Sequence, residues 1–444
     1  MSLTSNSIDL KQGFIRQFEL FEKALNGKSL TDFHQTRKKA LKAFEGLGLP
    51  DRKTENYKYT PITRSLNKKF RFDYESLGKP TISKEVVDKL LIKDLDAYNI
   101  VLINGQYSKE LSSVDIELSG LEIRDFKSAY EAQPDLVGTY FAKYANFNED
   151  PFTALNTAFS LDGTFMKVAD NVVVDKPVMV YAIADANAAN WAVQPRNLVI
   201  VGKNSQASII ENYISLGNEP TFTNAVSEIV LDENAYFDYY KLEMQGENAY
   251  HVGNTQVYQV RSSTFNATTI SLTGSLIRNN LNVVLDDEHC EANMNGLYLL
   301  DDHQHVDNQT VVDHKKPNSL SNELYKGILG GSSTGVFNGR IYVRPNAQKT
   351  NAFQSNKNIL LTDEASINAK PQLEIWADDV KCSHGATTGQ LDEEQLFYLR
   401  SRGIGQQEAR SLLLYAFAMD ALEKVKIDVL REYIDHHINT RLNK

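Results

Sequence analysis

Residues 373–387 bring together the side chains with the greatest capacity for chemistry in this sequence. Cys382 and His384 stand two residues apart there. Residues i and i+2 of a β-strand point to the same face, so a strand would aim the thiol and the imidazole in one direction. A thiolate and a neutral imidazole can both bind a transition metal or an iron–sulfur cluster. A buried thiol beside a hydrogen-bonded histidine is the alternative, which composition alone favours.

Two neighbouring carboxylates, Asp378 and Asp379, precede this pair. Adjacent strand residues point to opposite faces, which makes them poor partners for acid–base catalysis. A structural role is the simpler interpretation: they cap turns or pair with Lys381.

A second candidate site lies at His303, His305 and His314. A His-x-His pair with a later histidine resembles the metal site of cupin-like barrels, with water in an open position. The cupin pattern places a glutamate soon after the second histidine, whereas Asp307 and Asn308 follow here. A metal-dependent β-helix or cupin-like enzyme using these three histidines therefore stays open as the alternative function.

Bulk composition excludes several classes of protein. The 444 residues carry a net charge of −10, which argues against binding to a nucleic-acid backbone. Two distant cysteines, Cys290 and Cys382, predict reduced thiols rather than a disulfide framework, and they cannot form a four-thiolate site alone. The polar start of the sequence and the lack of a long apolar run predict a cytoplasmic protein without membrane insertion.

The hydrophobic pattern divides the sequence into three parts: a helical and mixed domain at 1–150, a β-helix core at 151–388 and a helical domain at 389–444. Helices are expected from about 9 to 25 and from Thr31 to Glu45. Short strands then succeed one another without helical periodicity, and helices return after Gly389. Small residues at Ala207, Ala235 and Ser263 indicate a repeat of about 28 residues. The predicted fold is mainly β, a β-solenoid or a large sandwich between two helical regions.

The sequence contains no nucleotide-binding fingerprint. Residues 330–335 are rich in glycine but lack the Gly-Lys-Ser/Thr ending of a phosphate loop, and no nucleophile elbow occurs. We therefore expect no ATPase activity from this chain by itself.

The amino-acid sequence of several segments resembles that of the SufB/SufD family of iron–sulfur cluster assembly proteins. The similarity spans at least residues 150–425 and is carried by residues 194–197, 231–235, 294–298, 325–329, 336–339, 346–350, 354–361, 373–389 and 396–404. Gly385 after His384 is typical of the SufD branch. Residues 55–60 are similar to a Glu-x-Trp-Arg-Tyr-Thr segment of that branch but differ at Tyr57 and Lys58.

The resemblance implies a right-handed parallel β-helix in a non-catalytic scaffold subunit of the SufBCD complex. Such a chain pairs with SufB through the β-helix ends, and it could form a homodimer when isolated. It binds the ABC-type ATPase SufC through C-terminal helices, here through Phe397, Tyr398, Arg402, Leu413 and Phe417. The complex builds an iron–sulfur cluster near Cys382 and His384, of which the histidine is better supported. The family also implies FAD as a reductant in the full complex, although no flavin motif is present.

Overall fold

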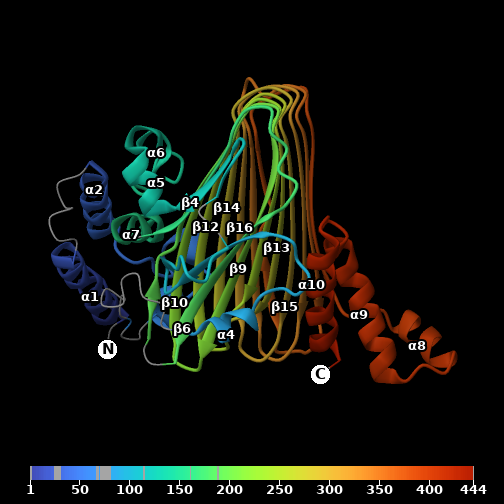
Figure 1. Ribbon diagram of the computed structural model, residues 1–444. Coiled ribbons are helices and arrows are strands. Elements are labelled where there is room, and N and C mark those ends of the chain that lie inside the picture. The colour runs from blue at the N-terminus through green and yellow to red at the C-terminus, as the bar shows by residue number, and fades with distance from the viewer. Residues whose placement is uncertain are drawn as a thin grey trace.

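Two stacked β-sheets form the body of the protein, a parallel β-solenoid of about eight turns. The computed structural model describes residues 3–24, 32–66, 70, 82–113, 116–160, 162–187 and 190–443 (Figure 1). The strands alternate between the sheets along the chain, so each turn lays one strand on each sheet. This confirms the mainly β solenoid with helical regions at both ends of the chain.

The first sheet has ten strands. In spatial order they are β2 (Gln106–Tyr107), β1 (Tyr98–Ile103), β6 (Val178–Ala186), β9 (Gln206–Gly217), β11 (Tyr236–Met244), β13 (Thr264–Thr273), β15 (Glu291–Leu300), β17 (Leu320–Leu329), β19 (Asn351–Leu360) and β22 (Lys381–Gly389). All neighbours are parallel except β1 and β2.

The second sheet has twelve strands, two of which, β7 and β21, lie off its main path. In spatial order they are β20 (Ser366–Ala369), β18 (Thr334–Val343), β16 (His305–His314), β14 (Leu276–Leu285), β12 (Ala249–Gln259), β10 (Thr221–Leu231), β8 (Arg196–Val201), β5 (Gly163–Val168), β4 (Leu121–Asp125) and β3 (Ile116–Leu118), while β21 (Gln372–Ile375) pairs with β18 and β7 (Ala192–Val193) with β10. Residues 172–174 are apolar but form only an isolated bridge, between Val173 and Gln206.

Small buried residues stack at one corner of the solenoid, directly before the strands of the first sheet. They are Ser205, Ala235, Ser263, Cys290, Ser319 and Thr350. Each follows a residue with positive φ, such as Asn204 (54°) or Asn234 (56°), which turns the chain sharply into the next strand. The repeat predicted from Ala207 was therefore misaligned at that position, because Ala207 lies opposite Phe237 and Ser205 holds the corner.

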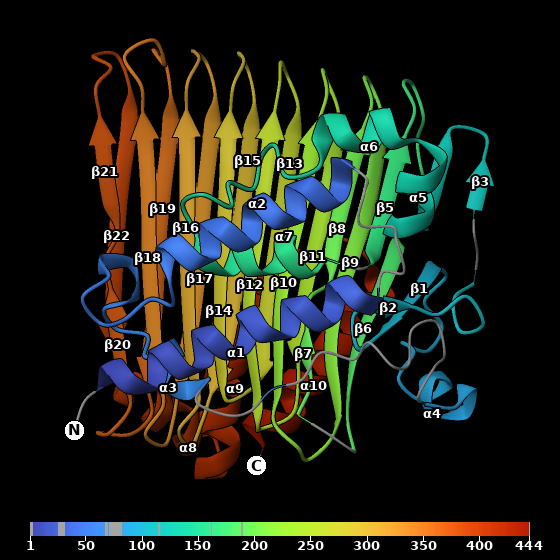
Figure 2. The ribbon, with the colours of Figure 1, turned by 90° about the vertical axis from the view of Figure 1, so that its left-hand side faces the viewer.

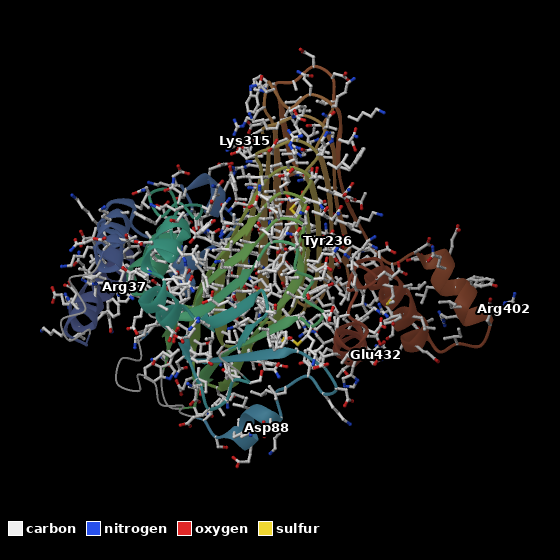
Figure 3. All side chains as sticks on the ribbon, turned by 45° about the horizontal axis from the view of Figure 1, so that its top comes forward. Arg37, Asp88, Tyr236, Lys315, Arg402 and Glu432 are labelled. Atoms are coloured by element: carbon white, nitrogen blue, oxygen red, sulfur yellow. The ribbon has the colours of Figure 1, made fainter. Side chains whose placement is uncertain are left out.

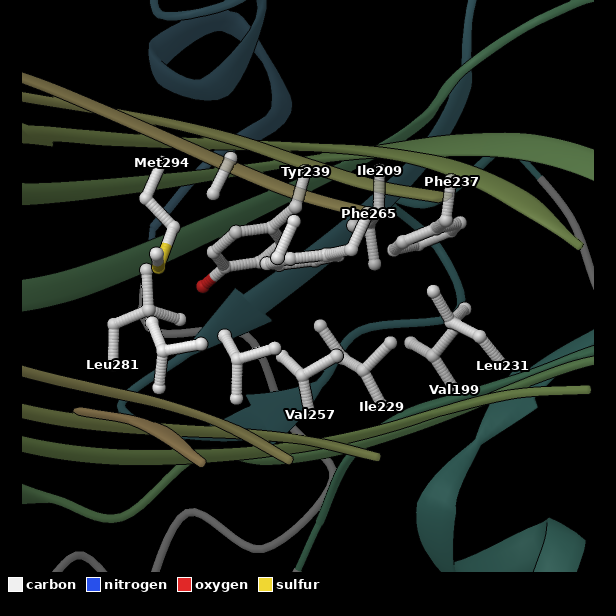
Figure 4. Close-up of a cluster of buried hydrophobic side chains, with 14 of the residues drawn as sticks. Val199, Ile209, Ile229, Leu231, Phe237, Tyr239, Val257, Phe265, Leu281 and Met294 are labelled. Carbon is white, nitrogen blue, oxygen red and sulfur yellow. The ribbon is translucent and has the colours of Figure 1, made fainter. Parts of the chain in front are cut away.

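The interior between the sheets holds a continuous apolar core. Phe237, Tyr239 and Phe265 from the first sheet meet Ile229 and Val257 from the second (Figure 4). Strands alternate their side chains, so the same sheets also expose a second apolar face outward. Helices cover both of these outer faces.

The N-terminal helices cover the outside of the second sheet (Figure 2). These are α1 (Leu3–Ala24), α2 (Asp32–Leu47) and α7 (Pro151–Phe159), which pack Phe14, Phe44 and Phe152 against Phe222 of β10. Thr31, the expected start of the second helix, lies outside the described residues. Shorter helices occur at η2 (Glu55–Tyr57), α3 (Ile62–Ser65), α4 (Lys84–Asp88), α5 (Phe126–Ala132) and α6 (Pro134–Tyr140).

The C-terminal helices cover the outside of the first sheet. They are α9 (Gln406–Leu422) and α10 (Asp428–Leu442), whereas α8 (Glu393–Ser401) precedes them, has no buried residue and projects away from the sheet (Figure 1). Leu414 of α9 and Ile434 of α10 bury apolar side chains in one cluster with Leu242 and Ile270 of the sheet. No helix in the described part of the chain is both long and apolar enough to cross a membrane.

Candidate functional site at the open end of the solenoid

Strand β22 forms the last strand of the first sheet, and no strand of the described chain lies beyond it. The Lys381 N–H donates to the Thr350 carbonyl at 2.9 Å, so Lys381 turns its backbone groups toward β19. Backbone direction alternates along a strand. The backbone groups of Cys382, His384 and Ala386 therefore face the free edge, which can accept another strand.

Cys382 and His384 do share one face of β22, as predicted. Cys382 pairs in register with buried Ala352 and packs against the interior core, which places its side chain on the lumen side. His384 lies two residues further and is exposed because no further turn covers it. The two residues therefore stand at the mouth of the lumen.

The electrostatics distinguish the two groups. Burial raises the pKa of the Cys382 thiol, against a backbone hydrogen bond with Ala352 that lowers it. A raised pKa keeps the thiol protonated near neutral pH, and the thiolate is the form that binds metal. The Cys382 thiol must lose its proton before it can bind metal, whereas the His384 imidazole binds through a ring nitrogen. His384 is therefore the stronger candidate ligand of the two.

Two buried polar residues lie behind His384 in the lumen. Gln354 of β19 is in register with His384, and Glu323 of β17 is in register with Gln354. Gln354 Nε2 donates to Glu323 Oε2. Burial raises the pKa of Glu323 to about 7, whereas the hydrogen bond from Gln354 lowers it. Sequence analysis missed both residues, because a polar side chain in a solenoid is assigned to the lumen only once the register is known.

Asp379 of the aspartate pair has a structural role, but its partner is not the one predicted. Asp379 forms an ion pair with Lys349 rather than with Lys381, and the Asp379 carbonyl accepts a hydrogen bond from the Lys349 N–H. This contact joins the corner turns that precede β19 and β22. It therefore fixes the turn that leads into β22 and the site.

A groove of about 770 Å³ borders the same strand on the outer face of the first sheet. Asn266, Asn293 and Asn322 line it as a ladder in which each amide donates to the preceding turn at 2.9 to 3.0 Å. Lys426 pairs with Asp238 at 2.9 Å. The amides of this ladder and the Lys426–Asp238 pair satisfy one another. His384, Gln354 and Glu323 also line the groove, so it continues the site at the open end.

The residues predicted to dock the ATPase fall into two sets. Phe397 and Tyr398 on α8 are 73% and 56% exposed, and the Arg402 guanidinium lies 5.2 Å from the Tyr398 ring. Figure 3 places Arg402 at the far tip of the C-terminal helices. Leu413 and Phe417 on α9 are half-buried. Phe417 is also held by Lys326, whose Nζ lies 4.3 Å from its ring and donates to its carbonyl at 2.8 Å.

The three histidines of the alternative metal site do not come together. His303 is exposed in the turn before β16. His305 is 3.2 Å from the Thr60 hydroxyl on the outside of the second sheet, whereas buried His314 is 2.9 Å from Ser321 Oγ. Among the residues described, no group of three or more His, Cys, Asp or Glu side chains is arranged to hold a metal ion.

The N-terminus of α8 does not suit the flavin that the family implies for the full complex. Helix α8 follows β22 directly, which is where a dinucleotide pyrophosphate would meet a helix N-terminus. Asp392 already caps that helix, since its carboxylate accepts from the N–H groups of Glu394 and Gln395. An anionic side chain at this position disfavours a second anion.

Comparison with known proteins covers nearly the whole chain. The profile of the SufBD core domain of SUF-system FeS cluster assembly matches residues 183–417, and that of the SufBD N-terminal region matches residues 8–180. The iron–sulfur cluster assembly SufBD family protein of Synechocystis is 30% identical, with 91% of this chain and 90% of that protein covered. The iron–sulfur cluster assembly protein SufD of Escherichia coli is 31% identical, with coverage of 89% and 90%.

SufD of Bacillus subtilis is 27% identical over 92% of this chain and 95% of its own length. The two domain profiles follow one another along the chain, and these relatives are matched over nearly their whole length. The chain therefore belongs to the SufBD family of iron–sulfur cluster assembly proteins.

Proposed function

We propose that this chain is a non-catalytic scaffold subunit that pairs with SufB, recruits the ATPase SufC and helps to build iron–sulfur clusters in the cytoplasm. The free edge of β22, which carries Cys382 and His384, is the observation that supports this most directly. A partner strand on that edge would satisfy its backbone groups and bring further ligands to the mouth of the lumen.

His384 is proposed as the group of this chain that contacts the iron or sulfur of the nascent cluster. A thiol and an imidazole supply at most two positions, so the partner chain or sulfide must supply the others. Reconstituted complex with His384→Ala should give less cluster absorbance in the visible range. Cys382→Ser should have a weaker effect, since its thiol is largely protonated.

The matched control is His303→Ala, which removes another exposed histidine from a turn at a different place on the solenoid. It should leave cluster yield unchanged. A normal yield with His384→Ala would remove this residue from the assembly mechanism.

The ATPase is proposed to dock on α8 through Phe397, Tyr398 and Arg402. None of the residues of α8 is buried, so Phe397 and Tyr398 leave apolar surface that the described part of the chain does not cover. Deleting the C-terminal helices would also uncover the cluster that α9 and α10 share with the first sheet. Point substitutions on α8 are therefore the sharper test.

Phe397→Ala with Tyr398→Ala should abolish co-purification with SufC and leave the unfolding curve unchanged. Tyr59→Ala, which alters a 43%-exposed tyrosine of the N-terminal region, is the control and should retain the ATPase. Full recovery of SufC with the double variant would show that it docks elsewhere. Leu413 and Phe417 are expected to contribute less, because both are half-buried.

A further inference from the structure

The side chain of Gln354 is unusually constrained for a lumen residue near the open end. It is 3% exposed, and its Nε2 donates to Glu323 Oε2 on the neighbouring strand β17. Its Oε1 has no hydrogen-bond partner among the described residues. A buried carbonyl oxygen without a donor is costly, so a donor is expected to reach it.

Gly339 on the opposite sheet fixes where this amide lies. A Cβ at position 339 would come within 2.1 Å of Gln354 Nε2 and 2.6 Å of its Cδ. The glycine therefore leaves the space that the amide occupies across the lumen. With Glu323 on one side and Gly339 in front, the amide has little freedom to turn.

His384 is the residue placed to complete this arrangement. The amide nitrogen of Gln354 is directed to β17, and the two polar atoms of an amide point apart, so its oxygen is turned away from that strand. The strand on the other side is β22, where His384 stands in register with Gln354. The imidazole has an N–H to give and shares the lumen face.

We propose that Gln354 is a positioning residue that accepts a hydrogen bond from one ring nitrogen of His384 and so fixes its tautomer. The other ring nitrogen then carries its lone pair toward the open end of the solenoid. The identity of the group it meets there rests on the proposed function. The positioning itself is a property of this chain alone.

The test uses the full chain with ¹⁵N-labelled histidine and reads the ring nitrogen shifts at a pH where the ring is neutral. These shifts report which nitrogen carries the proton. The His384 signals among the nine histidines are identified by their loss in His384→Gln. The wild-type ring should show a single tautomer, and Gln354→Met should show a mixture of both.

Asn356→Leu is the matched control. Asn356 lies on the same strand and face and is fully buried, but it pairs in register with Ala386. It should leave the His384 tautomer unchanged. Gln354→Leu gives a second variant without the acceptor oxygen if the methionine variant folds poorly.

Identical His384 shifts in wild type and in both Gln354 variants would overturn the proposal, as would an equal change in Asn356→Leu. Cluster yield in the complex is measured separately. If Gln354→Met loses the single tautomer while His384→Ala still gives normal clusters, the positioning inference holds and the proposed role of His384 fails.

Discussion

At the scale of single residues, a buried ion pair explains why the segment 194–197 carries an arginine. Arg196 is fully buried and donates to Glu228, while Asn156 and Thr157 accept from its other terminal nitrogen at 3.2 and 3.1 Å. Glu228 in turn accepts from backbone N–H groups of residues 142, 144 and 145 at 2.8 to 3.0 Å. This ion pair ties the α6–α7 link to the second sheet.

Arg196→Met should therefore cost about 3–5 kcal/mol of unfolding free energy, because it leaves the Glu228 carboxylate buried without its cation. The matched change is Lys203→Met. Lys203 pairs with Glu233 at 3.7 Å on the surface, and its loss should cost less than about 1 kcal/mol. Urea unfolding of both variants provides the comparison, and equal costs would contradict this account.

His314 gives a prediction for pH. Burial lowers its pKa to about 3, whereas an unfolded histidine titrates near about 6.5. Between these values the unfolded chain binds a proton that the folded chain does not. Stability due to this residue is therefore complete above the unfolded pKa and is lost as pH falls, by about 2 kcal/mol at pH 5.

His314→Gln should reduce that loss, since glutamine can still bond to Ser321 but does not titrate. The measurement is the change in unfolding free energy between pH 7.5 and pH 5 in wild type and variant. Because the comparison is a difference of differences, the remaining histidines contribute equally to both proteins. An unchanged pH dependence would show that His314 becomes protonated without unfolding.

At the scale of elements, residues 55–60, which are similar to a segment of the SufD branch, anchor the N-terminal region. The Arg278 guanidinium lies 3.9 Å from the Tyr57 ring and donates to the Asn56 carbonyl at 2.9 Å. Thr60 donates to Asp307, which also pairs with Arg278. The segment thus joins the N-terminal helices to strands β14 and β16.

Tyr57→Ala should loosen this anchor, because it removes a buried ring and its hydroxyl contact with Asp150 at 3.1 Å. A cost on the order of 3 kcal/mol is expected for such a ring. Hydrogen exchange should speed up in residues 55–66 and stay unchanged in the solenoid turns. Tyr59→Ala is the control. If exchange in residues 55–66 speeds up equally in Tyr59→Ala, Tyr57 is not the anchor.

How well the sequence predicts a strand or helix depends on which of its faces are buried among apolar residues. Strand β8 was evident because its apolar run packs on both sides, and the terminal helices showed their periodicity. The first sheet was harder, since β11 places Lys241 and Glu243 in the lumen. Register also decides the site: Cys382 and His384 were visible in the sequence, whereas Gln354 and Gly339 meet only across the closed turn.

At the scale of the whole molecule, the two ends of the solenoid differ. At the N-terminal end the sheets finish in the short antiparallel strands β2 and β3, which blunt their edges. At the C-terminal end β22 is long and exposed, and Ile375 and Trp376 near it are 40% and 49% exposed. One end can therefore accept a strand, and the other is poorly suited to do so.

This asymmetry predicts the behaviour of the isolated chain. If two copies join through the same open end, the contact is self-complementary and closes at a dimer. Sedimentation velocity should then show only monomer and a species of twice its mass as concentration rises. Ala386→Pro should shift the protein to monomer, because it removes an N–H that faces the free edge without breaking the ladder with β19.

Ala386→Ser keeps that N–H and should dimerise like the wild type. The same proline should weaken pairing with SufB, since both partners would use one edge. Growing oligomers at high concentration would mean that the N-terminal end also accepts a strand. A dimer that persists unchanged in Ala386→Pro would move the contact away from β22, and with it the argument that the partner completes the site at His384.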